Sequence, residues 1–332
     1  MGGSKRRMVP GAGEDPDILQ ALVEAEAIAG EDDEAFLRHL NARYSRKRNA
    51  AMRTRGILPV RAVPAADDES PRAHVLRNDP RFLANARALA RRSQGGLRVI
   101  GGAKVPPNQF LDCVAVGRDD VWGCTGTLIA PDVVVSAGHC ASVATRVFFG
   151  GDVKKAGKIV KVKQAVRHPS YHKAGKHNDL LVLLLEQPVV NIAPRAIATA
   201  AQVNKATDGR VVGFGNTDPF GTKGYGVKRQ VDIPIASPSC KGTVDGDPDA
   251  VAFGCDVNLE MVAGKPLLGK DSCTGDSGGP LYIEGPGGGW LLAGATSRAV
   301  DSAPNDCGDG GIYVRIDKYR AWIEGLPGVS LP

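Results

Sequence analysis

TGDSGGP at residues 274–280 is the stretch of this sequence that decides the fold, together with SAGHC at residues 136–140. The first stretch places Ser277 in a glycine-rich turn, where the missing side chains let a substrate carbonyl approach backbone N–H groups. The second places His139 directly after an apolar run. Asp179, within Asn-Asp-Leu at residues 178–180, stands just before a run of leucines and valines, a position suited to a partly buried acid. A nucleophile, a base and an orienting carboxylate are therefore all present.

In the order His139, Asp179, Ser277, these segments resemble the chymotrypsin/trypsin family closely, and the resemblance covers essentially all of residues 99–332. It implies an all-β fold of two six-stranded antiparallel β-barrels with the active site in the cleft between them. Ser277 would be the nucleophile, His139 the general base and then acid, and Asp179 the carboxylate that orients it. The N–H groups of Gly275 and Ser277 would form the oxyanion hole.

Composition agrees with a soluble, β-rich globular chain. Aromatic residues make up only 5% of the chain, Gly and Pro are abundant, and short apolar runs such as 180–185 favour many strands joined by turns. Residues 318–325 predict a closing helix. No apolar run approaches the length of a membrane span. The basic cluster at residues 5–7 is not followed by an apolar core, so no secretory signal peptide is visible.

Residues 1–98 read differently from the rest of the chain. They hold 18 Lys and Arg against 13 Asp and Glu, which is +5 of the net charge of +6. Acidic clusters interrupt the basic residues and aromatics are sparse, which argues against a nucleic-acid partner. Asp-Pro-Asp at 15–17 starts a predicted helix with an apolar face over residues 18–25, and a second apolar patch covers 36–44. A Pro-rich linker at 56–72 and a short helix at 79–92 complete a partly helical segment.

LRVIGG at residues 97–102 lies at the boundary between these regions and resembles the family's activation junction. Cleavage after Arg98 would make Val99 a new amino terminus. Its ammonium would insert and pair with Asp276, ordering the oxyanion hole and the substrate pocket, because a buried charge needs a partner. On this interpretation residues 1–98 are the prosegment of a zymogen and residues 99–332 are the peptidase domain.

The same resemblance assigns substrate specificity. Asp271 stands six residues before Ser277, where trypsin carries the acid that pairs with Arg or Lys before the cleaved bond. Cleavage after Arg98 would then suit the enzyme's own specificity, which would allow self-activation. Gly311 matches the small residue that keeps this pocket open, and Ser297 matches the serine that supports the catalytic aspartate.

One wall of the expected pocket departs from trypsin. Arg298 and Ala299 replace the usual Trp and Gly, and the segment at 300–306 is longer. Arg298 either favours acidic residues upstream of the cut or is simply solvated. We expect the former, because the aligned position lines the cleft.

All seven cysteines lie after residue 98, and no CxxC pair occurs, which argues for disulfides over a zinc ribbon or a thioredoxin motif. The resemblance implies three disulfides, which are Cys124 with Cys140, Cys240 with Cys255, and Cys273 with Cys307. Cys113 is left over, and we expect a buried free thiol.

No metal or cofactor is expected. The segment that matches trypsin's calcium loop, at residues 150–155, is short and basic and lacks oxygen ligands. His168, His172 and His177 cluster in sequence, but no carboxylate or thiolate stands at ligand spacing.

The prediction is therefore a serine endopeptidase that cuts after Arg or Lys and acts on protein or peptide substrates as a monomer, unless the prosegment docks a partner. An inactive binding module on the same fold and an independent interaction domain at residues 1–98 remain as alternatives. Three disulfides indicate secretion or a periplasm, whereas the missing signal peptide leaves an intracellular location as the alternative.

Overall fold

The computed structural model describes two parts of the chain. In the N-terminal third these are residues 18–30, 32, 35, 36, 38 and 39. In the remainder they are residues 102–332 without 120, 173–176, 218–223, 245, 265–270, 302, 304–307 and 309. The predicted linker at 56–72, the predicted helix at 79–92 and the junction at Arg98 and Val99 lie outside the described residues.

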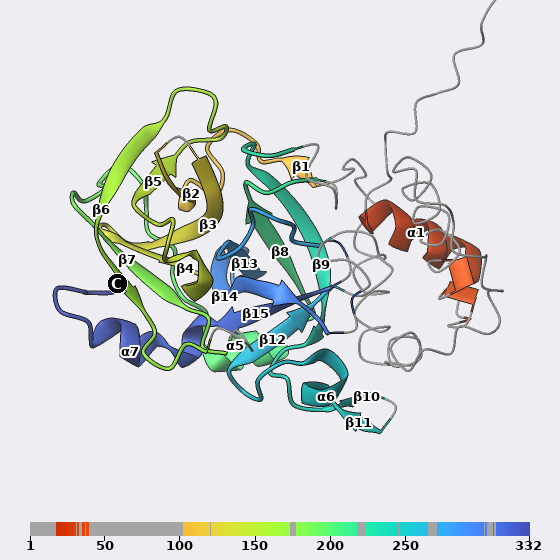
Figure 1. The fold of residues 1–332 in the computed structure, drawn as a ribbon. Helices are drawn as coiled ribbons and strands as arrows, with labels where there is room; N and C mark the ends of the chain where they lie inside the picture. The colour runs from red at the N-terminus through yellow and green to blue at the C-terminus, as the bar shows by residue number, and fades with distance from the viewer. Residues whose placement is uncertain are drawn as a thin grey trace, which may run out of the picture.

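The first half of the predicted peptidase domain forms a closed antiparallel barrel in the order β2-β3-β4-β7-β6-β5 (Figure 1). Its strands are β2 (Cys113–Arg118), β3 (Val121–Ala130), β4 (Val133–Ser136), β5 (Arg146–Phe149), β6 (Lys158–Arg167) and β7 (Leu181–Leu185). β4 is buried on both faces: Val133 and Val135 join one apolar cluster and Val134 another. This explains why β4 and β7 are continuous apolar runs without polar alternation.

The second half forms another six-stranded barrel, which closes through the pairing of β8 with β9. Its strands are β8 (Asp208–Gly213), β9 (Arg229–Ser237), β12 (Glu260–Ala263), β13 (Pro280–Glu284), β14 (Trp290–Ala299) and β15 (Gly311–Arg315). A short strand β1 (Ala103–Lys104) pairs with the start of β9. The predicted pair of six-stranded antiparallel barrels is confirmed.

Short helices and one hairpin complete this region. They are η1 (Gly138–Cys140), α5 (Ala200–Lys205), α6 (Asp249–Phe253), η2 (Ile316–Lys318), α7 (Arg320–Glu324) and the hairpin of β10 (Thr243–Val244) with β11 (Asp247–Pro248). η2 and α7 confirm the closing helix predicted over residues 318–325. Among the described residues, no helix has the length and apolar character needed to cross a membrane.

An ionic network around the buried Asp112 links the two barrels. The Asp112 carboxylate, beside β2, accepts hydrogen bonds from Arg195 Nε at 3.0 Å and from the Tyr282 hydroxyl on β13 at 2.6 Å. The Arg195 guanidinium also lies over the Tyr282 ring, 5.0 Å from its centroid. Because the pair is nearly enclosed and each partner has further contacts, it links the barrels with a fixed geometry.

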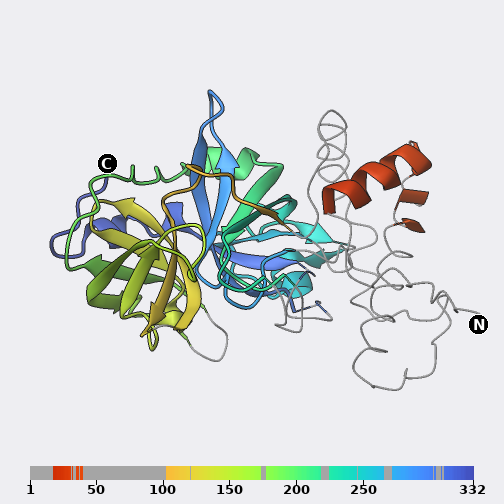
Figure 2. The ribbon, with the colours of Figure 1, turned by 90° about the horizontal axis from the view of Figure 1, so that it is seen from above.

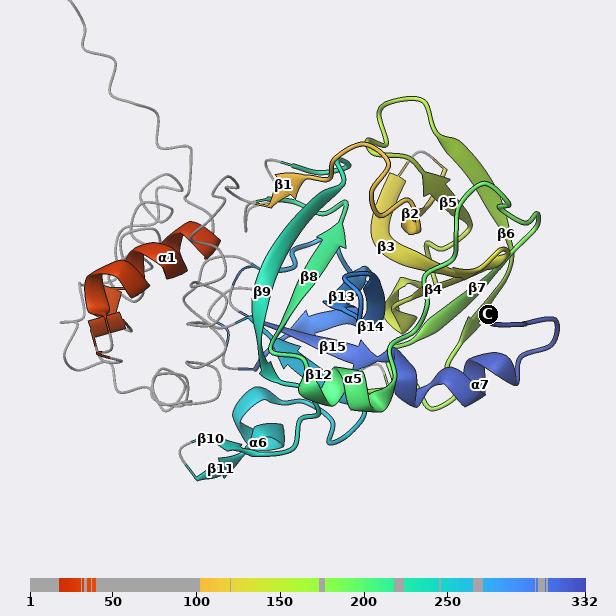
Figure 3. The ribbon, with the colours of Figure 1, turned by 180° about the vertical axis from the view of Figure 1, so that it is seen from behind.

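The N-terminal third contributes helix α1 (Ile18–Ala29), where a helix was predicted. α1 packs against β9 on the side of the second barrel that faces away from the first barrel (Figures 1, 2 and 3). The order in space is thus first barrel, second barrel, α1.

Candidate active site

His139 and Asp179 meet because their strands pair. β4 ends at Ser136 opposite Leu181 at the start of β7, so the residues just beyond these ends are neighbours. Asp179 is completely buried. Its Oδ1 accepts the backbone N–H of His139 and its Oδ2 lies 2.8 Å from the ring Nδ1. A carboxylate can only accept hydrogen bonds, so the ring Nδ1 must be the donor and carry the hydrogen. In the neutral ring, Nε2 then keeps its lone pair.

The second barrel also contributes to this carboxylate. The Ser297 hydroxyl, on β14, donates to Asp179 Oδ2 at 2.7 Å. Asp179 therefore accepts three hydrogen bonds from two barrels, which compensates for its loss of water. The site lies where the two barrels meet.

The turn that follows Ser277 packs against the segment that leads into His139. Gly278 has φ +77° and its N–H donates to Thr296 O on β14. A Cβ on Gly278 would lie 2.2 Å from Ser136 Oγ and 2.4 Å from Ala137 N. Only glycine therefore lets the turn rest on the segment that leads into His139. The Ser277 carbonyl accepts Thr125 N–H at 2.8 Å, which ties the same turn to β3.

The N–H groups of Gly275 and Ser277 are directed to no acceptor within the described residues. Gly275 has φ +101°, and its carbonyl accepts the Thr125 hydroxyl at 2.8 Å. Within the described residues, both amides thus meet the requirement that the expected oxyanion hole sets for its donors. Among the hydrogen bonds of the described residues, none joins the Ser277 hydroxyl to the ring of His139. Hydrogen bonds between a nucleophile and its base are often long until substrate binds.

Asp271 lies in a setting that suits a bound cation. Its Oδ1 accepts the Tyr313 hydroxyl and the Ser272 N–H. Desolvation raises the pKa of its carboxyl to about 7. A Cβ on Gly311 would lie 2.9 Å from Asp271 Oδ2, and one on Gly264 would lie 3.4 Å from Asp271 Cγ. Both glycines therefore make room for this carboxylate.

Asp276, next to Ser277, is a second acid without a nearby cation among the described residues. Its carboxylate accepts the Gly215 N–H at 2.8 Å and the Cys273 N–H at 2.9 Å. Burial raises the pKa of Asp276 to about 6. Side chains at Gly213 and Gly215 would collide with this carboxylate, so both glycines make room for it.

Arg298 differs from both interpretations of the sequence, which placed its charge toward substrate or water. Its guanidinium forms two hydrogen bonds with Glu260 on β12, at 2.6 and 2.8 Å, and a third with Gly254 O at 2.8 Å. The two side chains are only 11% and 1% exposed. The charge of Arg298 is therefore already neutralised inside the protein. No local pattern in the sequence indicates Glu260 as the partner, because it lies 38 residues away.

The cysteines follow the predicted pattern as far as they are described. Cys124 pairs with Cys140 and Cys240 with Cys255. Cys273 is disulfide-bonded, while its predicted partner Cys307 lies outside the described residues.

Cys113 is the buried free thiol that was predicted. Burial raises the pKa of its thiol well above the ordinary value, so it behaves as an apolar core side chain.

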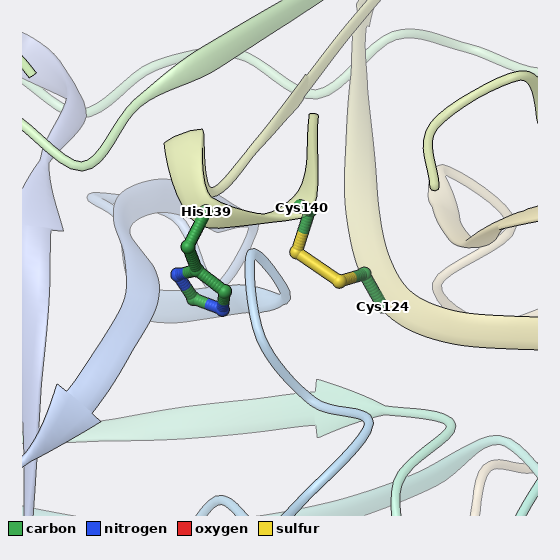
Figure 4. A group of neighbouring side chains, drawn as sticks. All are labelled: Cys124, His139 and Cys140. Atoms are coloured by element: carbon green, nitrogen blue, oxygen red, sulfur yellow. A yellow bond between two sulfur atoms is a disulfide. The ribbon is translucent and has the colours of Figure 1, made fainter. Parts of the chain in front are cut away.

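Cys124, His139 and Cys140 bring three potential metal ligands within 4.8 Å of one another (Figure 4). Figure 4 shows that both sulfurs belong to the disulfide, so they cannot act as thiolate ligands. The disulfide instead anchors the backbone beside His139. His177, from the histidine cluster, pairs with Asp256 at 2.7 Å, while His168 packs on Tyr319 and Trp322.

Comparison of the sequence with known proteins matches it to one family. The family model described as Trypsin matches residues 99–323. The chain is 31% identical to trypsin 5G1 of Aedes aegypti over 250 residues, which cover 72% of this chain and 88% of the relative. It is 33% identical to trypsin of Saccharopolyspora erythraea over 231 residues, covering 67% and 94%. Human kallikrein-14 is 33% identical over 215 residues, covering 60% and 73%.

Proposed function

The chain belongs to the trypsin family of serine endopeptidases, and from this premise we propose that it cleaves peptide bonds after Arg or Lys and is made as a zymogen activated between Arg98 and Val99. The observation that carries the proposal is the Asp179 carboxylate, which accepts His139 from one barrel and Ser297 from the other.

The proposed chemistry uses His139, Asp179 and Ser277 as the triad. Ser277 Oγ attacks the scissile carbonyl while His139 Nε2 takes its proton, and Asp179 stabilises the resulting imidazolium through Nδ1. The N–H groups of Gly275 and Ser277 bind the oxyanion. His139 then protonates the leaving amine, and a water molecule hydrolyses the acyl-enzyme by the same route.

Asp271 supports the specificity for Arg or Lys. A guanidinium or ammonium entering past Gly264 and Gly311 would meet a carboxylate that the described residues leave without a cation. Ion pairing would return to Asp271 the stabilisation that it lost on desolvation.

Asp276 supports activation by cleavage at Arg98. A free amino group at Val99 could supply the cation that this buried carboxylate lacks, with Gly213 and Gly215 giving access. Pairing would hold the turn that carries the Gly275 amide. Mass spectrometry of active enzyme should show a chain that begins at Val99. Full activity of uncleaved Arg98→Gln protein would contradict this route.

Labelling with a fluorophosphonate tests the catalytic proposal. Cleaved protein should react at Ser277, and Ser277→Ala protein should not. Loss of Ser277 should reduce kcat by about four to six powers of ten. A cleaved, folded protein that takes up no label would instead indicate an inactive binding module on the same fold.

The disulfides support an oxidising compartment for this enzyme, so we propose that it works after secretion or in a periplasm. Alkylation of thiols in protein from its native source tests this location. Labelling of Cys124 and Cys240 without prior reduction would place the enzyme in the cytoplasm instead.

A further inference from the structure

The N-terminal segment is folded onto the protease by its own local signals. α1 ends at Ala29 and is followed by Gly30, whose φ of +54° is the left-handed conformation that terminates helices. The Asp32 carboxylate then accepts the Ala35 N–H at 3.0 Å and caps a second helical turn. This turn carries Phe36. The chain therefore reverses after α1 and presents a second apolar residue to the same side.

Both parts of this helical reversal are buried against the second barrel. Ala25 on α1 and Phe36 are 0% exposed, and both belong to the same apolar cluster as Ile233 and Ile235 of β9. Ala29 packs against this cluster as well. Ile28, on the same helix, is 66% exposed. Ala25 and Phe36 thus pack against the protease, while Ile28 faces solvent.

The burial pattern of β9 indicates that both of its faces are covered near its end. Residues 233–237 at its end are all buried, although neighbouring side chains in a strand point to opposite faces. One face of a barrel strand is covered by the barrel interior, so the other face needs a cover of its own. α1 is the helix that packs on β9, on the side away from the first barrel (Figures 1 and 3).

We propose that the outer face of β9 is a docking surface for residues 18–39 of the same chain, and that this segment stays bound as a separate chain after the connection to the protease is cut. All seven cysteines lie after residue 98, so no disulfide can hold the segment. Retention would therefore rest on non-covalent contacts, which include the burial of Ala25 and Phe36. α1 lies beyond the second barrel, on the side away from the first barrel (Figure 2), and the proposed site residue His139 belongs to η1, which follows β4 of the first barrel.

The experiment uses the full-length Ser277→Ala chain, with residues 93–98 replaced by the recognition sequence of an unrelated site-specific protease. After cleavage, gel filtration and native mass spectrometry at micromolar concentration should find both fragments in one complex. Neither the activity of this enzyme nor natural cleavage at Arg98 enters this test, so its failure is distinct from failure of the proposed function.

Phe36→Asp should weaken the complex by at least about 100-fold, since truncating a buried Phe costs about 3 kcal/mol or more. Ile28→Asp is the matched control at an exposed position of α1 and should leave the fragments together. Ala25→Asp is a second disruptive variant. Thermal melting of the separated protease fragment should show a folded domain with a lower Tm than the complex.

Two results would overturn the proposal. One is separation of the two fragments of the parent chain on gel filtration at micromolar concentration. The other is equal retention of the Phe36→Asp and Ile28→Asp segments, which would mean that the buried face does not hold them.

Discussion

Arg298 and Glu260 form a buried, two-pronged ion pair between β14 and β12, directly beside Ser297, which donates to Asp179. Arg298 Nη1 also lies 3.4 Å from Ser297 Oγ, whose hydrogen goes to Asp179. The position thus has a structural partner inside the protein, where sequence comparison placed a substrate contact. Glu260 in turn accepts the Asp256 N–H at 2.7 Å, and Asp256 pairs with His177.

Glu260→Gln should destabilise the fold by about 3–5 kcal/mol, because it leaves the Arg298 guanidinium enclosed without a counter-charge. Denaturant unfolding of Ser277→Ala protein measures this change. The double variant Glu260→Leu with Arg298→Met should be much closer to the parent, since no buried charge remains.

The matched control for this pair is Glu324→Gln, which breaks an exposed pair with Arg320 and should cost less than about 1 kcal/mol. An effect of Glu260→Gln as small as that of the control would show that the buried pair contributes no more than a surface pair.

Binding of a small amidine at Asp271 should strengthen as the pH rises toward 7. Desolvation raises the pKa of this carboxyl to about 7, so below that pH the cation must displace a proton. Affinity should rise about tenfold per pH unit up to that value and then level off. Titration of cleaved Ser277→Ala protein from pH 5.5 to 8.5 measures it.

Asp271→Asn should bind the same amidine weakly and with no such rise in affinity. A parent protein whose affinity does not change across this range would contradict the assignment of Asp271 as the cation's partner.

The uncleaved chain should lose stability between about pH 4 and pH 6 because of Asp276. Burial raises its pKa from 3.8 to about 6, so the folded state holds the proton more tightly than the unfolded state. The stabilisation is therefore complete below about pH 4 and is lost as the pH rises through 6, a change of about 3 kcal/mol. Unfolding of full-length Ser277→Ala protein at a series of pH values measures it.

Asp276→Ala should remove this part of the pH dependence while leaving the contribution of Asp271 in place. Cleavage that frees Val99 should abolish the dependence as well, because the new ammonium favours the ionised carboxylate. Identical pH profiles for the parent and Asp276→Ala would contradict the prediction.

Gly278→Ala should cost about 3 kcal/mol of stability and at least a hundredfold in kcat/KM. Its Cβ would overlap Ser136 Oγ and Ala137 N at a φ of +77°, so the turn that carries Ser277 would have to move. Gly289→Ala is the control, because nothing lies within 4 Å of its added Cβ. Unfolding and peptide hydrolysis should be nearly unchanged in the control, and equal effects of the two variants would refute the argument.

The sequence predicted most of the fold because its signals are local. The apolar runs of β4 and β7, the helix that follows Asp-Pro-Asp at 15–17, and the closing helix at the C-terminus were each visible within a short window. The pairings Cys124 with Cys140 and Cys240 with Cys255 came with the family resemblance and are confirmed.

Several neighbours of the proposed site gave no such signal. Tyr313 donates to Asp271 from 42 residues away, and Thr125 holds the Gly275 carbonyl from 150 residues away. Gly213 and Gly215 look like ordinary turn glycines until the carboxylate of Asp276 is placed against them. These contacts depend on which strands close each barrel, and a short window of sequence does not contain that information.

The sequence by itself determined the candidate chemistry. The motifs around His139, Asp179 and Ser277 and their order along the chain resemble one family, and this resemblance was enough to propose their roles. Tertiary structure alone decided what surrounds these groups. It paired Arg298 with Glu260, left Asp271 and Asp276 without a cation among the described residues, and laid α1 on β9. The physical reason is that burial and charge pairing depend on distance in space, which barrel closure sets between residues far apart in the chain.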